Sequence, residues 1–464
     1  MTMGIAFQDE ILRVMPEALL MGPEGYPMES LRALLRAGVV RHLFQDGGPE
    51  QRLETVRQCA FLSVELALSL GITVSLFTDP VRRFAPGVWS GEMEAGFVSG
   101  GMLGGMMITE PGCGTDLTAC ETRYDLEAGI TGVKHWAGLT GSADYWLVLA
   151  RDDPPGRHYR LPSLNFYICR ADPYAFTLLK RYASAGLRSI PYGRTRLRIR
   201  EGLIGPLFSG SRAERLRLIH GVLQRSRISI AAIAAGACER LAGEAAAHTR
   251  SRVVFGKPLI SYEQARARLR EVEAARDINR VLFGVACRET ARSDASGTEV
   301  PAVPANAVKV VSTDLAFAAA TSASQLLGGE SYRTDLYIGR ATSDLRPFRI
   351  FEGSNDVLCD ALWQAVKKAA TAGEPSFAER IRDACETVNV PVPPLDAFHA
   401  PETDGAVPQG LRCLGGRMIA QAVCLKACAE ANLSPESCAP LAARILRDAH
   451  AAATWGASAG LVEY

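Results

Sequence analysis

The chain has 464 residues, too many for one simple core, and this length predicts two to four domains. Hydrophobic residues make up 48% of it, and 51 Lys and Arg residues balance 50 Asp and Glu residues. The balanced charge gives no general attraction to nucleic acid or to acidic membranes. Twelve cysteines without CxxC spacing favour structural thiols in a reducing cytosol over disulfides or a metal site.

The start of the chain and its apolar runs bear on where the protein works. Residues 1–20 lack the basic region of a signal peptide and carry acidic residues early. No apolar run reaches the length needed to cross a bilayer, and the longest, "VELALSLGITVSLF" and "GFVSGGMLGGMMI", are typical of buried core. We therefore expect a cytoplasmic protein without a membrane span.

The expected elements, taken in chain order, predict an α+β fold in four parts. Residues 1–104 form a helical domain, because "QRLETVRQCAFLSVELALSL" repeats apolar residues at spacings of three and four. Residues 105–205 contain short strands such as "DYWLVLAR" and "RTRLRIR", with turns such as "DDPPG" between them, and predict a small β-barrel or sandwich. Residues 206–375 return to long helices, and residues 376–464 join a linker rich in Pro and Gly to a helical extension.

Five segments on this frame could carry chemistry, and each has an ordinary structural explanation. In "MMITEPGCGTD" the glycines let a backbone approach a ligand, but an ordinary loop would look the same. In "ITGVKHWAG" the Trp is either an aromatic wall or a core residue. In "SRVVFGKPLISYEQ" an Arg could clamp a phosphate or lie on the surface beside a helix end. In "QLLGGESYRTD" paired glycines end a helix, which a plain C-cap explains.

The fifth segment, "FRIFEGSNDVLCDAL", places Glu352 between an apolar stretch and a flexible Gly353-Ser354. A buried carboxylate is costly unless it is paired or protonated, and no basic residue follows for more than a dozen positions. By itself this segment is explained better by a solvated loop glutamate or by a charge at a helix N-terminus than by catalysis. Neither a Rossmann GxGxxG nor a Walker P-loop is present, so those two routes to a nucleotide are absent.

In this order the five segments resemble the acyl-CoA dehydrogenase family of flavoenzymes. The segment "ITEPGCGTD" is similar to the family's TEPxxGSD, "ITGVKHW" to ITGxKxW, "RVVFGKPL" to RxxFGKPL, "QLLGG" to QxxGG and "RIFEGSND" to the IYEGT segment. The motifs cover residues 106–362 clearly, and the helical N-terminus agrees only loosely. The resemblance implies an N-terminal helical domain, a central β-domain and a C-terminal four-helix bundle, with FAD between the β-domain and the bundle.

The resemblance also implies a reaction, with Glu352 as its base. Glu352 would remove the α-proton of an acyl thioester while the flavin accepts the β-hydrogen as hydride, and the product is the trans-2-enoyl thioester. An apolar neighbourhood such as Ile350 and Phe351 would raise the proton affinity of the carboxylate by desolvation. The backbone N–H of Glu352 and the flavin ribose would hold the thioester carbonyl, as an oxyanion hole does.

Other roles carry over at matching positions. The resemblance implies FAD contacts at Met106, Ile108, Thr109, Gly114, Thr115, Trp136, Arg252, Phe255, Gln264, Gln325, Gly328, Gly329, Ser354 and Asn355. Arg252, Phe255, Gln325, Gly328 and Gly329 would hold the FAD of a neighbouring subunit. Substrate contacts are implied at Thr115, Gln224, Arg227 and Gly353, with Arg227 near the CoA moiety, and no metal is implied.

The chain departs from the family pattern at several places. The family's WITNG reads "WAGLTG", so the hydroxyl after Trp136 is missing and Thr140 is a possible replacement. The Gln expected after FGKPL comes one place late, as Gln264, with Glu263 at the expected position. The usual Arg-Asp upstream of the base is Ser343-Asp344. Some members carry the base on the helix of Arg227 instead, but Arg225 and Ser226 cannot serve there.

Alternatives remain for the reaction, the carrier and the assembly. The expected electron acceptor is an electron-transferring flavoprotein; the alternatives are an oxidase or monooxygenase of the same fold that uses O2 and, from another class, a flavin-free binding protein. The thioester carrier is either CoA or an acyl-carrier protein. A helical extension after about Ser376 favours a homodimer over the tetramer that members without such an extension form. Its lack of a strongly basic amphipathic face favours subunit contact over membrane docking.

Overall fold

The computed structural model describes residues 2–45, 47–89, 91–154, 162–395, 398 and 407–458. Part of the predicted "DDPPG" turn and part of the predicted linker lie outside these residues. The chain forms two compact units, one of residues 1–226 and 333–344, the other of residues 227–332 and 345–464. The predicted division into four domains stays a prediction.

The first unit opens with a run of helices. The longest apolar stretch among them, α5 with the π-helical turn η2 (Val74–Thr78), is buried on nearly every side, as a helix without a polar face must be. Ser63 begins α5 by accepting a hydrogen bond from the Leu66 backbone N–H. The helices are α1 (Thr2–Val14), α2 (Glu17–Leu20), α3 (Met28–Arg36), α4 (Pro49–Leu62), α5 (Val64–Thr73), α6 (Asp79–Phe84), α7 (Pro86–Trp89) and α8 (Glu92–Val98).

One helical run in this unit, Val64–Phe84, is long and apolar enough to cross a membrane by length and composition alone, contrary to the expectation from the sequence. In the structure 78% of its most apolar window is buried against the rest of the fold. The run therefore has the surroundings of a core helix.

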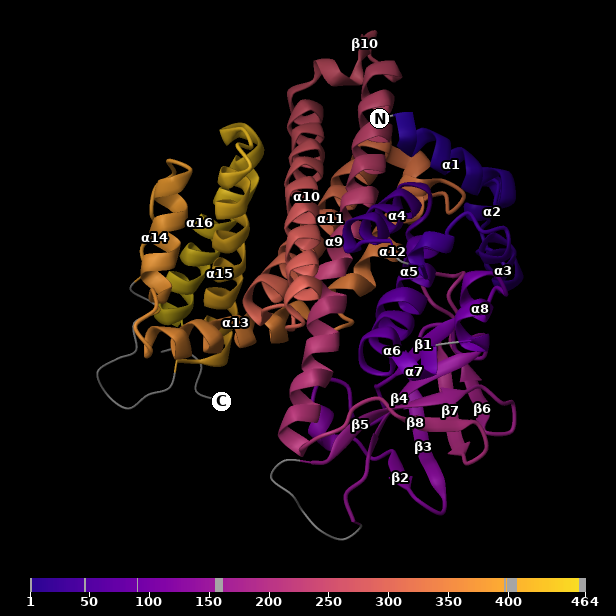
Figure 1. Ribbon diagram of the computed structural model, residues 1–464. Coiled ribbons are helices and arrows are strands. Elements are labelled where there is room, and N and C mark those ends of the chain that lie inside the picture. The colour runs from indigo at the N-terminus through magenta and orange to yellow at the C-terminus, as the bar shows by residue number, and fades with distance from the viewer. Residues whose placement is uncertain are drawn as a thin grey trace. The chain divides into compact units, whose positions relative to one another are not determined.

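The sheet of the first unit has the order β6-β7-β3-β2-β4-β5-β8, with β1 added parallel to β4 (Figure 1). Its two edges, β6 and β8, are separate, so the predicted barrel or sandwich is one curled, open sheet. Strand β7 shows why the sequence predicted strands here, because its residues are alternately buried and more accessible. The strands are β1 (Gly104–Met107), β2 (Arg123–Asp125), β3 (Gly129–His135), β4 (Tyr145–Arg151), β5 (Leu164–Arg170), β6 (Phe176–Arg181), β7 (Gly193–Ile199) and β8 (Leu203–Pro206).

The second unit is helical. It contains α9 (Arg212–Ser251) from Arg227 onward, α10 (Glu263–Ser296), α11 (Ala302–Leu327) and α13 (Asn355–Ala370). A short hairpin of β9 (Val253–Val254) and β10 (Lys257–Pro258) joins α9 to α10. Gly297 ends α10 in the left-handed conformation, and Ser354 begins α13 by accepting a hydrogen bond from the Val357 backbone N–H. Helix α12 (Tyr337–Leu345) belongs to the first unit up to Asp344.

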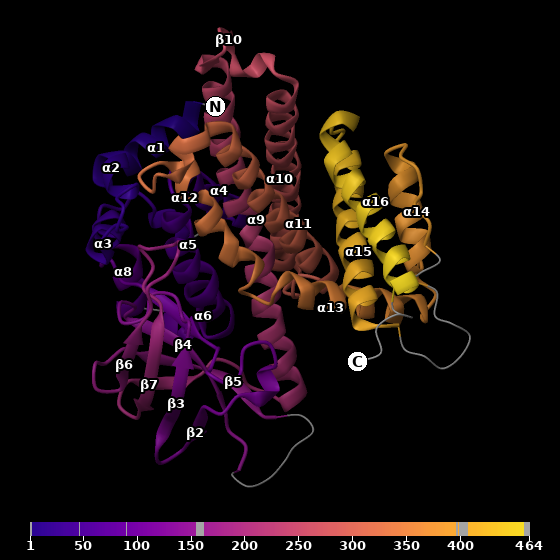
Figure 2. The ribbon, with the colours of Figure 1, turned by 180° about the vertical axis from the view of Figure 1, so that it is seen from behind.

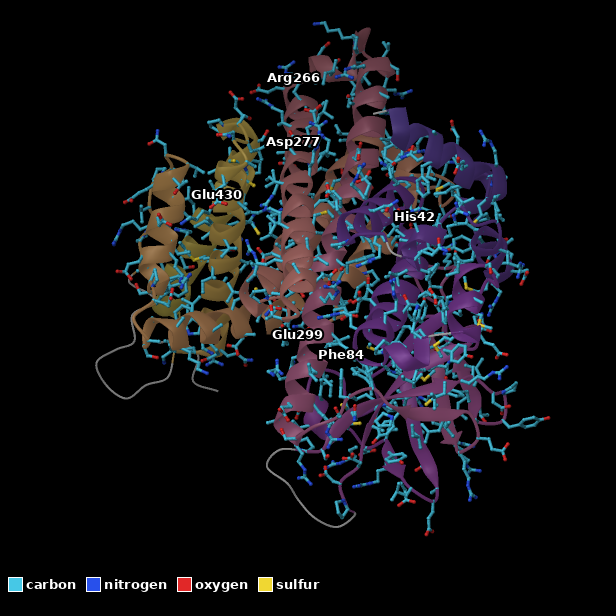
Figure 3. All side chains as sticks on the ribbon, in the orientation of Figure 1. His42, Phe84, Arg266, Asp277, Glu299 and Glu430 are labelled. Carbon is cyan, nitrogen blue, oxygen red and sulfur yellow. The ribbon has the colours of Figure 1, made fainter. Side chains whose placement is uncertain are left out.

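The C-terminal extension packs within the second unit as α14 (Phe377–Thr387), α15 (Gln409–Glu430) and α16 (Pro435–Ser458), which lie side by side in both views (Figures 1 and 2). Ser376 and Glu379 begin α14 with a reciprocal capping box. Asp277 of α10 (Figure 3) accepts a hydrogen bond from the Ser437 hydroxyl of α16 at 3.3 Å. The extension is thus tied by side-chain contacts to the helical bundle of its own unit.

Candidate active site

Glu352 lies on a sharp turn between η6 (Arg346–Arg349) and α13. Its backbone is left-handed, with φ of +58°, and Gly353 follows with φ of +89°. A left-handed conformation is rare for a residue with a side chain and costs of order 1 kcal/mol, so the surroundings must hold it. Strain of this kind is concentrated at functional sites more than elsewhere, which makes the turn a candidate site in its own right.

Two cations hold the carbonyl groups of this turn. Arg227 of α9 donates through Nε to the Glu352 carbonyl oxygen at 2.6 Å. Lys309 of α11 donates through Nζ to the Gly353 carbonyl oxygen at 2.9 Å and to Asn355 Oδ1 at 2.8 Å. A Cβ on Gly353 would lie 3.1 Å from Leu358 and 3.4 Å from Arg227, so little room remains around the turn.

Asn355 is the centre of a buried hydrogen-bond network below the turn. Its Nδ2 donates to Thr313 Oγ1 at 3.0 Å and to Asp314 Oδ1 at 2.9 Å. The same Asp314 oxygen accepts from Arg349 Nε at 2.6 Å. Both ends of the segment that carries Glu352 are therefore fastened to α11.

Charge and burial oppose one another at this site. Burial lowers the pKa of Lys309 to about 7, although attraction from Glu352 acts in the opposite direction. Burial likewise lowers the pKa of Arg227, again against the attraction of Glu352. The Glu352 carboxylate thus lies within electrostatic reach of two partly desolvated cations. Ile350, expected to desolvate it, is 54% exposed in this chain, and Phe351 is half-buried.

In the first unit, the loop after β1 is built around a buried ion pair. Glu110 accepts a hydrogen bond from Lys134 Nζ of β3 at 2.7 Å and from the backbone N–H groups of Glu121 and Thr122. The same lysine donates to the Ile108 carbonyl oxygen at 2.9 Å. The Glu of the TEP segment and the Lys of the ITGxK segment therefore fix this loop to the sheet.

The outer part of the same loop is open. Gly114 and Thr115 are exposed, and a Cβ built on Gly112 or Gly114 would meet no atom within 4 Å among the described residues. Internal packing therefore does not require glycine at either position. Thr109 is half-buried and Met106 is buried, and the Thr109 carbonyl accepts a hydrogen bond from the His135 backbone N–H at 2.9 Å.

Trp136 follows β3 in a left-handed conformation, with φ of +59°, and 51% of it is exposed. Its ring centroid lies 4.5 Å from that of Tyr182 and 6.2 Å from that of Tyr192. Tyr182 is fixed in turn by a 2.7 Å hydrogen bond between its hydroxyl and His135 Nδ1. The core explanation of Trp136 is therefore wrong, and this end of the sheet presents an aromatic surface next to the Thr109 loop.

The remaining predicted cofactor residues lie at the other end of α9. Arg252, Phe255, Gln264, Gln325, Gly328 and Gly329 are all exposed, Phe255 to 94%. His248 is within electrostatic reach of both Arg252 and Glu330, so the hairpin and the end of α11 are neighbours. Arg252 follows Arg227 by 25 residues, which is roughly 37 Å along a helix. Arg252 and its neighbours therefore lie far along α9 from Arg227 and the Glu352 turn.

Two of the departures from the family pattern have structural outcomes. Thr140 is buried and its hydroxyl donates to the Ala137 carbonyl oxygen at 2.6 Å, so it does not supply the missing hydroxyl after Trp136. Asp344 is buried and accepts a hydrogen bond from the Leu187 backbone N–H at 2.7 Å. Gln224 is half-buried on α9, one turn before Arg227.

The chain is similar to known proteins in sequence and in structure. The family description "Acyl-CoA dehydrogenase, C-terminal domain" matches residues 216–367, which include Arg227, Lys309 and Glu352. A curated relative, the short-chain specific acyl-CoA dehydrogenase of Megasphaera elsdenii, is 26% identical over 352 residues, covering 72% of this chain and 88% of the relative. The chain is thus similar to acyl-CoA dehydrogenases in its helical bundle and along most of its length. These similarities support an oxidoreductase of the class that acts on a CH–CH group.

Solved structures of acyl-CoA dehydrogenases have a fold similar to that of this chain. Butyryl-CoA dehydrogenase from Megasphaera elsdenii superposes with a TM-score of 0.65 at 23% identity, covering 80% of this chain and 98% of that one. The acyl-CoA dehydrogenase complexed with FAD from Bacillus anthracis superposes with a TM-score of 0.78 at 16% identity, covering 97% of this chain and 87% of that one. The likeness to the second structure thus extends over nearly the whole chain.

Lys309 is a site residue that was not predicted from the sequence. The nearest cations after Glu352 are more than a dozen residues away, whereas Lys309 precedes it by 43 residues. A signal was present, because a lone lysine stands within the apolar helical run "AVKVV". A charged residue at a core position is buried only when it has partners, and a search for its partners would have led to the turn.

Proposed function

We propose that this chain is an acyl-CoA dehydrogenase family member and uses FAD to remove two hydrogens from the α and β carbons of an acyl thioester, giving the trans-2-enoyl thioester. The observation that carries this proposal is the Glu352 turn. It is strained, it is fastened on both sides to α11, and its carboxylate is held near two cations. A surface glutamate in a solvated loop would need none of these.

The residues present fit an FAD. The exposed Gly114 and Thr115 offer backbone N–H and hydroxyl donors of the kind that a pyrophosphate takes. Trp136 offers an exposed aromatic face to a planar ring. Met106 lies buried in β1, Ile108 and Thr109 lie on the loop that follows it, and Ser354 and Asn355 lie beside the base. When bound, the flavin supplies the hydride acceptor for the reaction.

The chain's own residues supply the proton chemistry. A Glu352 carboxylate oxygen takes the α-proton, and the backbone N–H of Glu352 donates to the thioester carbonyl oxygen, which becomes more negative as the proton leaves. Arg227 and Gly353 keep this N–H and carboxylate in place, since the Arg227 guanidinium is already bonded to the Glu352 carbonyl. Thr115 and Gln224 are proposed contacts of the thioester arm.

Reduction of the bound flavin by saturated acyl thioesters tests this proposal. The purified protein is expected to show a flavin absorption band that an acyl-CoA or an acyl-pantetheine bleaches anaerobically. Glu352→Gln keeps the flavin but reduces the rate of bleaching by about 10²–10⁴-fold, because it removes a positioned general base. Glu386→Gln, a matched change of an exposed glutamate on α14, leaves the rate unchanged.

The same experiment separates the alternatives. Peroxide formed with O2 at the turnover rate would point to an oxidase instead of a dehydrogenase that passes electrons to an electron-transferring flavoprotein. A protein that binds no FAD when FAD is supplied would exclude the proposal. We also propose that the protein is a cytoplasmic homodimer in which each copy contacts the FAD of the other. The contacting residues would be Arg252, Phe255, Gln264, Gln325, Gly328 and Gly329. A light-scattering mass of one chain would exclude the dimer.

A further inference from the structure

A lysine ammonium is buried beneath the turn that carries Glu352. Lys309 lies in the stretch 305–313 of α11, in which every residue is buried. Burying an ammonium costs several kcal/mol unless it is paired and hydrogen-bonded. The two contacts of its Nζ, to the Gly353 carbonyl and to Asn355 Oδ1, provide the local compensation. A methionine or leucine would fill the same space without this cost, so the contacts are the reason for a lysine here.

Helix α11 fastens the catalytic segment on both sides of Glu352. Three residues before Glu352, Arg349 is paired with Asp314. After it, Gly353 is bonded to Lys309, and Asn355 is bonded to both Lys309 and Thr313. Lys309 and Thr313 are four residues apart and so lie on one face of α11, and Asp314 beside them also reaches Asn355. Lys309 is the member of this face whose contacts lie closest in sequence to the base.

The ammonium also acts on the Glu352 carboxylate through space. The attraction that Glu352 exerts on Lys309 is mutual, so a charged Lys309 favours the ionised form of the glutamate. A carboxylate must be ionised to accept a proton. The charged and titratable groups around Lys309 are Glu352 on the turn, Arg227 on α9, Asp314 on α11, Arg349 on η6 and Cys359 on α13, with Arg417 of α15 and Arg444 of α16 near Asp314.

We propose that Lys309 is a positioning residue of this active site, which holds the Glu352–Gly353 turn in its left-handed form through its two hydrogen bonds and whose charge acts on the Glu352 carboxylate. This inference rests on the proposed function, because it assumes that Glu352 is the base. Lys309 itself does not need to touch the substrate or the flavin. It acts through the Gly353 carbonyl, the Asn355 side chain and its charge.

Three substitutions separate the hydrogen bonds from the charge. Lys309→Met removes both, Lys309→Gln keeps a donor without charge, and Lys309→Arg keeps both in a different shape. Lys368→Met, which changes an exposed lysine near the end of α13, is the matched control. For each protein the bound FAD, the melting temperature and the rate of anaerobic flavin reduction by a saturated acyl-CoA are measured from pH 5 to pH 9.

Lys309→Met is expected to keep its FAD and to reduce the flavin about 10- to 100-fold more slowly, because the turn is less well held. The acid limb of its rate profile moves to higher pH by about one unit, because an opposite charge near the carboxylate is gone. Lys309→Gln shows the same shift with a smaller loss of rate. Lys309→Arg keeps the acid limb of the wild type, and Lys368→Met matches the wild type throughout.

A wild-type rate and pH profile in Lys309→Met would overturn the inference, as would a slower rate with an unmoved acid limb in both uncharged variants. If Lys309→Met does not fold, Lys309→Gln and Lys309→Arg decide the question by the same two measurements. The proposed function fails separately, if Glu352→Gln reduces its flavin like the wild type. A dead Glu352→Gln beside a normal Lys309→Met leaves the function intact and removes only the role of Lys309.

Discussion

Two of the lysines that the structure describes, Lys134 and Lys309, are fully buried, and their burial is compensated in different ways. Lys134 forms a direct ion pair with a buried carboxylate, Glu110. Lys309 is bonded to a backbone carbonyl and a side-chain amide, with its charge partner Glu352 on a turn that is only half-buried. The first arrangement is a fixed structural contact, whereas the second leaves a carboxylate available for chemistry.

Lys134→Met is expected to lower the free energy of unfolding by about 3–5 kcal/mol at pH 7, because it leaves the Glu110 carboxylate buried without its cation. The double variant Glu110→Gln/Lys134→Met should recover most of this loss, since no charge is then left unpaired. Urea unfolding of the three proteins measures both effects. Equal stability of Lys134→Met and the wild type would mean that the pair contributes nothing net.

The same pair predicts a dependence on acid. Burial raises the proton affinity of Glu110, but Lys134 and the hydrogen bonds to Thr122 and Glu121 outweigh burial and hold its pKa at about 2, below the usual 4.5. A carboxyl with a depressed pKa stabilises the fold above pH 4.5 and loses that contribution as pH falls toward 2. The wild type should lose about 3 kcal/mol over this window that Glu110→Gln does not lose. Parallel acid titrations of the two proteins would contradict this.

At the scale of elements, the sequence predicted those features that depend on neighbouring residues. The alternation of "RTRLRIR" predicted β7, and the TEP and EGS segments predicted the loop after β1 and the turn at Glu352. Features that depend on distant residues were beyond it. The parallel pairing of β1 with β4 and the contact of Lys309 with Gly353 join residues about 40 positions apart. No local period carries the identity of such a partner.

The close packing of α15 against α13 depends on two glycines of α15, Gly415 and Gly416. A Cβ on Gly416 would lie 1.7 Å from the Cys359 carbonyl oxygen, and one on Gly415 would lie 2.6 Å from the Trp363 ring. The two helices therefore approach more closely than side chains would allow. Because a Cβ on residue 416 would meet the backbone of Cys359, no change of side-chain rotamer in either helix could relieve the clash.

Gly416→Ala is expected to destabilise the extension by about 1–3 kcal/mol, because the added methyl group forces α15 away from α13. Gly243→Ala on α9 is the matched control, since this helical glycine is exposed and a Cβ there meets nothing within 4 Å among the described residues. It should be neutral or more stable by about 0.5–1 kcal/mol through helix propensity. Chemical unfolding and limited proteolysis of the extension report the difference; equal protection of both variants would contradict it.

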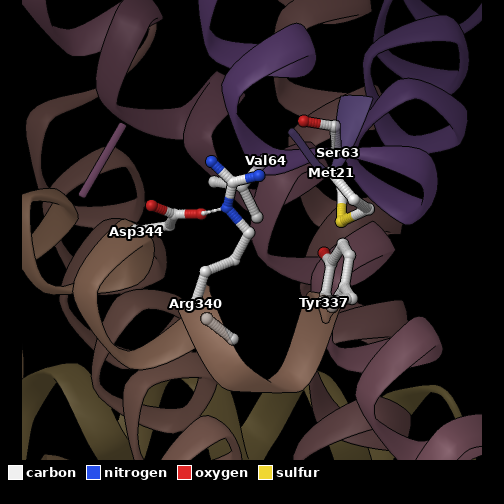
Figure 4. Close-up of a pocket in the computed structure, with 7 residues that line it drawn as sticks. Met21, Ser63, Val64, Tyr337, Arg340 and Asp344 are labelled. Atoms are coloured by element: carbon white, nitrogen blue, oxygen red, sulfur yellow. Dashed lines mark ion pairs between the residues drawn. The ribbon is translucent and has the colours of Figure 1, made fainter. Parts of the chain in front are cut away.

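At the scale of the whole molecule, the first unit is joined across long stretches of sequence by one buried charge cluster. Arg340 of α12 forms an ion pair with Asp344 at 3.2 Å (Figure 4). It also bonds to Glu65 of α5 at 2.9 Å and donates to the Leu20 carbonyl oxygen. Asp344 and Glu65 also accept hydrogen bonds from the loop before β7, at Leu187 and Ser189. The helices before the sheet, the sheet loop and α12 thus meet at one cation and two carboxylates.

Two buried carboxylates with one guanidinium leave an excess negative charge, and this sets a second dependence on pH. Burial, followed by repulsion from Glu65, raises the pKa of Asp344 to about 7 from its ordinary 3.8. The folded state then binds a proton more tightly than the unfolded state, so the contribution of Asp344 to stability is full below pH 3.8 and is lost as pH rises through 7. This direction is opposite to that of Glu110.

Asp344→Asn tests this, because the amide has the shape of the carboxyl and never ionises. Between pH 5 and pH 8 the wild type is expected to lose about 2–4 kcal/mol of unfolding free energy that Asp344→Asn retains. The variant should therefore be closest to the wild type, or more stable than it, at pH 8. Asp9→Asn, on the exposed face of α1, should follow the wild type at every pH. A difference between wild type and Asp344→Asn that stays constant from pH 5 to pH 8 would mean that Asp344 is ionised throughout and that Arg340 neutralises it fully.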